Sequence, residues 1–300
     1  MRRITARPSI GALTSSAVIF FGALAGTPAY AAWEFEPTAA EWASWSDYCR
    51  AQYSWVNAGF TFQYQYGGTV PAAIVDHWRQ VIGDSTFYGM HHWCASIHFL
   101  NRARSEADPK VHDFLLSRAN EDATYSFDRT DPKSFVYPDM AVTVAQIRDA
   151  KGKPDQAEAI LRKGMLAQPK RSEPYVMLAM LKRKQHKLSE ARDVLKQADE
   201  VTAGESPEVQ YNLGLINLEL GDTAAARANA RTAYRLGYPL PGLKNLLRKK
   251  GQWGAEDDAA VAAPGSSTAV ARADVASAAE PRARVDETRD DSAVPVDEKR

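Results

Sequence analysis

Three segments in the second half of the chain share one spacing of small and apolar residues, and this repeat constrains the fold more than any other feature. Each segment has a small residue followed 12 positions later by alanine, and further packing residues follow after 4 and then 3 positions. The small residues are Ala145, Ala179 and Gly214, which stand 34 and 35 positions apart. Such a period predicts short helical hairpins that stack, because one hairpin cannot bury its own apolar face.

Proline and glycine mark the ends of the predicted units. Pro169, Pro207 and Pro239 stand near the ends of second helices, where proline stops a helix. Gly152 and Gly221 fall in the turns between paired helices, where glycine adopts a positive backbone angle at little cost. The spacing predicts three units and a capping helix, at 138–171, 172–206, 207–240 and 241–253.

These units resemble the tetratricopeptide repeat family. The resemblance is carried by YNLGLINLELGDTAAARANARTAYRLGYP at 211–239 and by DQAEAILRKGMLAQPKRSEPYVMLAML at 155–181, although Lys182 and Asn217 replace the usual aromatic residue of the first helix. The resemblance implies an all-α fold, a right-handed solenoid of helical hairpins. It also implies a non-catalytic adaptor that holds a protein or peptide partner in a concave groove.

The preceding region, 32–137, has a different composition and is predicted to be a separate helical module. Six of the seven tryptophans lie between positions 33 and 93. Helical spacing of apolar residues predicts helices at 38–53, 72–82, 86–104 and 109–129, the last two forming a divergent repeat-like hairpin. Aromatic and polar residues alternate over 60–68, which we interpret as an extended loop. Its aromatic residues either cover the first hairpin, or the loop serves as a mobile lid or as a strap that binds a partner.

Cys49 and Cys94 are the only cysteines in the sequence. In an exported protein such a pair is compatible with a disulfide, whose loop closure would contribute about 4 kcal/mol in the chain-entropy model. Two buried thiols that pack as small apolar groups are the alternative.

A histidine-rich helix provides the candidate binding residues. At helical spacing His91, His98 and Arg102 share one strip, beside an apolar stripe that contains Cys94. One interpretation places the three polar residues, together with Asn217, on the partner-binding inner face of the solenoid. The alternative function is a metal- or haem-binding periplasmic protein whose ligands are His91, Cys94 and His98.

Both ends of the chain differ from its middle. Residues 1–31 carry three arginines, an apolar stretch and an Ala-x-Ala site before Ala32, which predicts a cleaved signal peptide; an uncleaved anchor is the alternative. The sequence therefore predicts export, to the periplasm if the source is Gram-negative, and no integral membrane segment after cleavage. The acidic tail, 254–300, lacks aromatic residues and is predicted to be disordered.

The charge balance and the absence of catalytic motifs narrow the function further. The chain carries 37 basic and 37 acidic residues, and residues 32–253 are close to neutral, which argues against nucleic-acid binding. We find no phosphate-binding glycine loop, nucleophile elbow or paired catalytic carboxylates. We therefore expect no enzyme activity and no cofactor, and by family analogy alone a role in cell-envelope assembly or secretion.

Overall fold

The computed structural model describes residues 37–55 and 70–262, which form helices and no strand. None of the helices within these residues combines the length and the apolar character needed to cross a bilayer. The predicted signal peptide at 1–31, the alternating segment at 60–68 and the tail from 263 onward lie outside the described residues.

The predicted first helix is two helices, α1 (Ala39–Ser44) and α2 (Asp47–Trp55), so the single helix expected at 38–53 is a wrong prediction. The chain breaks at Trp45, whose backbone is extended (ψ 148°). This conformation brings the Trp45 ring against the rings of Tyr53 and His98, at centroid distances of 4.9 and 6.1 Å. Aromatic packing thus outweighs the helical spacing of the sequence.

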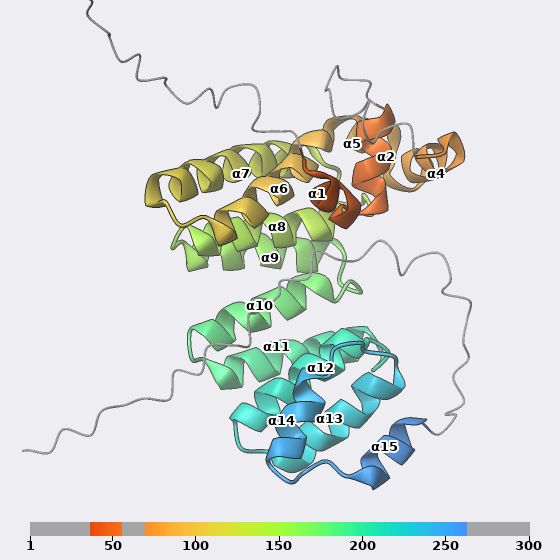
Figure 1. Cartoon of the computed structure of the whole chain (residues 1–300), viewed down its shortest axis with the longest axis vertical. Coiled ribbons are helices and arrows are strands. Elements are labelled where there is room, and N and C mark those ends of the chain that lie inside the picture. Colours follow the sequence, from red (N-terminus) through yellow and green to blue (C-terminus); the bar gives the residue numbers. More distant parts are fainter. Residues whose placement is uncertain (1–36, 56–69, 263–300) are drawn as a thin grey trace, which may run out of the picture. The chain divides into compact units, whose positions relative to one another are not determined.

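The next three predicted helices are four in the structure, because the single helix expected at 86–104 is divided at Met90 and is therefore a wrong prediction. They are α4 (Ala72–Ile82), α5 (Asp84–Gly89), α6 (His91–Ser105) and α7 (Pro109–Arg129). Helix α7 begins where Asp108 accepts hydrogen bonds from the backbone N–H groups of Lys110 and Val111. Helices α6 and α7 pack along each other, as the predicted divergent hairpin requires, and α7 then packs on the first clear unit (Figure 1).

The three predicted units are three consecutive helical hairpins (Figure 1). In chain order the pairs are α8 (Tyr137–Ala150) with α9 (Pro154–Ala167), α10 (Glu173–Lys184) with α11 (Leu188–Val201), and α12 (Pro207–Glu219) with α13 (Thr223–Arg235). The turns contain Gly152 at φ 68° and Gly221 at φ 83°, and His186 takes the equivalent position at φ 58°. The structure therefore confirms an all-helical, tetratricopeptide-like arrangement.

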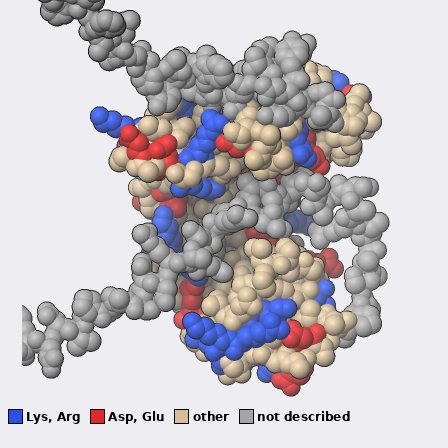
Figure 2. All heavy atoms as spheres, in the orientation of Figure 1, with Lys and Arg blue, Asp and Glu red and all other residues tan. Residues whose placement is uncertain are grey.

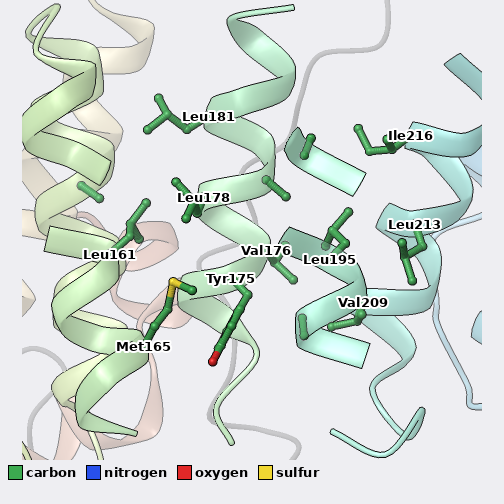
Figure 3. Close-up of a cluster of buried hydrophobic side chains, with 14 of the residues drawn as sticks. Leu161, Met165, Tyr175, Val176, Leu178, Leu181, Leu195, Val209, Leu213 and Ile216 are labelled. Atoms are coloured by element: carbon green, nitrogen blue, oxygen red, sulfur yellow. The ribbon is translucent and has the colours of Figure 1, made fainter. Parts of the chain in front are cut away.

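The small residues of the repeat lie where the helices approach each other most closely. Ala145 and Ala179 have no exposed surface, and neither do the repeat alanines of the second helices, which are Ala157, Ala191, Ala198, Ala226, Ala230 and Ala233. Large apolar side chains from neighbouring hairpins fill the space between them, including Leu161, Leu178 and Leu195 (Figure 3). Burying each such leucine contributes about 1.5–3 kcal/mol, so packing between hairpins stabilises the array.

Two helices follow the third hairpin. The predicted capping helix is α14 (Gly242–Lys249), whose Leu243 is buried and lies against Gly214 of α12. Residues Ala255–Ala262 form a further helix, α15, which packs on α13, so the disordered tail predicted from position 254 onward is wrong for these residues. The cause is charge, because Asp257 and Asp258 pair with arginines of α13 and α14.

Candidate partner-binding surface

The first helices of the three hairpins carry a continuous stripe that the core does not cover. Helices α8, α10 and α12 lie next to one another, and each keeps a row of half-buried side chains beside its buried ones. We call the central residues of these rows the first-helix face: Val142, Gln146, Met177, Met180, Leu215 and Leu218. Five of the six are apolar and pack with one side against the hydrophobic core.

The repeat itself places three of these residues, one from each unit, at equivalent points. Gln146, Met180 and Leu215 are separated by 34 and 35 positions, the same intervals that separate the small packing residues. Each stands one position after the small residue of its unit. Alignment of the units could therefore identify this face, which the buried repeat positions alone do not reveal.

Ion pairs join the three first helices at the end near their C-termini. Lys184 Nζ lies 3.0 Å from Asp149 Oδ2, which links α10 to α8. Arg183 pairs with Glu219, which links α10 to α12. Partly exposed pairs contribute little to stability, and here they place charged groups at one end of this face.

A second charged group stands at the opposite end of the same helices. The Arg171 guanidinium lies 3.2 Å from Asp139 Oδ2 and 2.9 Å from Glu173 Oε1, and it donates to the backbone oxygen of Phe135 at 2.9 Å. The face is therefore an apolar centre between two charged ends. Two of its members are methionines, whose flexible side chains adapt to different partners.

Helix α1 covers the strip that was predicted to be open around His98 and Arg102. Arg102 donates to both carboxylate oxygens of Glu41, at 2.9 and 3.1 Å. His98 is only 3% exposed, and its Nδ1 lies 3.6 Å from Glu41 Oε1. The prediction of an open inner face at these two residues is thus corrected, because they hold α1 on α6.

Burial and neighbouring charges set the protonation of this contact. Desolvation opposes ionisation of Glu41, but hydrogen bonds from Arg102 and the Thr38 backbone lower its pKa to about 2. Desolvation and the nearby Arg102 charge lower the pKa of His98 to about 4, although Glu41 acts in the opposite direction. At neutral pH a carboxylate therefore faces a guanidinium and an uncharged imidazole.

The three residues of the metal or haem alternative do not form a ligand set. Cys94 is bonded to Cys49, with the two α-carbons 5.7 Å apart, so its sulfur is not a free thiolate. His91 Nδ1 lies 3.1 Å from the backbone oxygen of Tyr88, while His98 faces Glu41. In the described part of the chain, no three histidine, cysteine or acidic side chains gather closely enough to hold a metal ion.

Asn217 lies inside the third hairpin and not on its surface. It is 6% exposed and donates to Asn229 Oδ1 of α13 at 2.9 Å, and Asn229 donates in turn to Gln210 at 2.8 Å. In the middle unit the equivalent Lys182 is buried between Glu158 and Glu190, at 2.8 and 3.0 Å. Polar contacts thus replace the aromatic packing usual at this repeat position, and Asn217 is corrected from a binding residue to a packing one.

Comparison with known proteins identifies the repeat. The family model of the tetratricopeptide repeat matches residues 207–236, the third hairpin. A search of curated proteins finds no match. Among solved structures, a thermophilic TPR protein of Thermus thermophilus is 16% identical; the match covers 54% of this chain and 92% of that chain, with a TM-score of 0.39.

Proposed function

Because this chain contains a tetratricopeptide repeat, within an array of three similar hairpins, we propose that it is a non-catalytic adaptor that binds a protein or peptide on the first-helix face. The fold is one that proteins commonly use for protein–protein interaction, which supports an adaptor role. The observation that carries the proposal is the row of half-buried apolar side chains between two charged ends.

The composition of the first-helix face favours a particular kind of partner. Interfaces between proteins usually have an apolar centre and a polar rim, and this face has the same organisation. Met177, Met180 and Leu215 supply the centre, and the ion pairs of Arg183 and Arg171 supply the rim. A segment with two or three apolar side chains and charged flanks would match it, either as a helix or as an extended peptide.

The cellular setting is a further part of the proposal and rests on sequence alone. Residues 1–31 have the charged, apolar and small-residue regions of a signal peptide, and so we place the mature protein outside the cytoplasm. In a Gram-negative source this would be the periplasm, where an adaptor would serve assembly of the cell envelope or secretion.

Site-specific crosslinking in the producing cell tests the binding surface. A photo-reactive residue at Met180 or Leu215 should give one discrete crosslinked product, identifiable by mass spectrometry. The matched control is Leu166, an 84% exposed leucine on the second helix α9, where the same probe should give none. Equal products at Leu166 and Met180, or none at Met180 and Leu215, would contradict the proposed face.

Export has its own measurement, independent of binding. The intact mass of the protein purified from its natural compartment should correspond to a chain that begins at Ala32. A mass that includes residues 1–31 would refute the cleaved leader but would leave the adaptor proposal unaffected.

A further inference from the structure

Helix α15 is held on the array by carboxylates that fit a set of four basic side chains. Arg227 and Arg231 come from α13, and Lys244 and Arg248 come from α14. We call these four residues the basic site. Figure 2 shows Lys and Arg side chains gathered over α14 with acidic side chains beside them.

Asp257 occupies the deepest point of the basic site. Its side chain has no exposed surface and accepts from Arg227 Nε at 2.7 Å, Arg227 Nη2 at 2.9 Å and Arg231 Nε at 2.5 Å. The backbone N–H of Gly254 donates to the same carboxylate at 2.8 Å. Each of these hydrogen bonds comes from an N–H group, and three of them come from cations, so the site recognises a carboxylate closely.

Asp258 and Glu256 complete the match. Asp258 accepts from Arg248 Nη2 at 2.6 Å and from the Trp253 indole at 3.0 Å, and Lys244 Nζ lies 3.7 Å away. Glu256 pairs with Arg227. Three consecutive acids thus meet four bases from two other helices.

Apolar burial contributes little to the attachment of α15. The helix has eight residues, which are the three acids, four alanines and Val261. Among the described residues, Val261 is the side chain of α15 that packs against the hydrophobic cluster of α12, α13 and α14. The four basic side chains keep between 27% and 46% of their surface exposed. Asp257 itself is buried, but the basic side chains around it are partly exposed, so salt and competing acidic groups can reach them and weaken the attachment.

We propose that the basic site is a receptor for an acidic peptide segment of a partner protein, one that begins a helix with consecutive Glu or Asp residues, and that α15 occupies it as a built-in competitor. The chemistry of the partner follows from the occupant, since α15 shows which side chains the site accepts and in which order. This surface lies on α13 and α14 and is independent of the first-helix face.

Peptide binding to the full-length chain tests the proposal. The probe is a fluorescent peptide with the sequence GAEDDAAVA, that of residues 254–262, and its control is GAQNNAAVA, which keeps the shape without the charge. In the full-length variant Asp257→Ala/Asp258→Ala the site is vacated, and the acidic peptide should bind at least tenfold more tightly than to the unaltered chain. Adding Arg227→Ala to that variant should abolish binding.

Three results would overturn the proposal. They are no binding to a vacated variant whose circular dichroism is unchanged, equal binding to the vacated and unaltered chains, and equal binding of the two peptides. If the vacated variant fails to fold, hydrogen exchange on the unaltered chain decides. Amides of α15 should lose protection between 0.05 and 0.5 M salt while those of α12 keep theirs, and undiminished protection of α15 would refute a competitor held by charge.

Discussion

Reduction of the Cys49–Cys94 disulfide should destabilise the tryptophan-rich region about as much as truncating one of its fully buried large side chains, such as Trp93. The bond joins α2 to α6 across 45 positions of sequence. Both cysteines are almost fully buried, at 2% and 1% exposure, so the bond belongs to the interior of this region.

The size of the effect follows from the length of the closed loop. In the chain-entropy model, closing a loop of about 45 residues removes unfolded-state entropy equivalent to about 4 kcal/mol at 25 °C. With a urea dependence of about 1–3 kcal/mol per molar, reduction should lower the unfolding midpoint by between about 1 and 4 M. A loss of about 4 kcal/mol is large against a typical free energy of unfolding of about 5–15 kcal/mol.

Tryptophan fluorescence is the suitable assay, because six of the seven tryptophans lie between positions 33 and 93. Urea unfolding is followed with and without a reductant. The Cys49→Ala/Cys94→Ala chain is the control, and its midpoint should match that of the reduced protein and not respond to reductant. A shift below about 0.3 M in the unaltered chain would refute the reasoning, since it would mean that the unfolded region is already compact without the bond.

Three further results are expected. Leu161→Ala should lower the free energy of unfolding, measured in urea, by about 2–5 kcal/mol, because the leucine is fully buried. Its control is Leu166→Ala, at a residue that is 84% exposed, which should change that free energy by no more than about 0.5 kcal/mol. Similar values for the two variants would contradict the packing described. Gly214→Ala should lower the melting temperature, because the new methyl would overlap Leu243 Cδ2, and an unchanged or higher value would show that α14 yields freely. The pKa of Glu41 is about 2 in the fold against an ordinary 4.5, so the stabilisation by its carboxylate is present above pH 4.5 and is lost as the pH falls toward 2. The difference in melting temperature between the unaltered chain and Glu41→Gln should therefore shrink between pH 6 and pH 2.5. A constant difference would refute this role of Glu41.

The repeat units could be predicted from the sequence because their pattern is local. Small residues such as Ala179 and Gly214 must recur wherever two helix backbones approach closely, and the turns between helices must accept a positive φ. Both requirements produce a residue pattern within one unit of about 34 residues, so the hairpins and their order can be predicted from the sequence alone.

The contacts that the sequence did not reveal are those between distant segments. Helical spacing indicated that His98 and Arg102 share a strip, but the carboxylate that covers them belongs to Glu41, 61 positions before Arg102. In the same way Asp257 finds Arg227 across 30 positions, in a segment whose composition alone predicts disorder. Composition and periodicity indicate which side chains a segment exposes, but they do not identify the distant residues that those side chains contact.

The disulfide also changes how cuts in this chain would be detected. Because Cys49 and Cys94 close a covalent ring, a single backbone cut at any bond between them leaves one molecule of almost unchanged mass. A protein nicked within this ring would migrate as intact until it is reduced. It would then separate into a short N-terminal piece and a long piece that carries all three repeats.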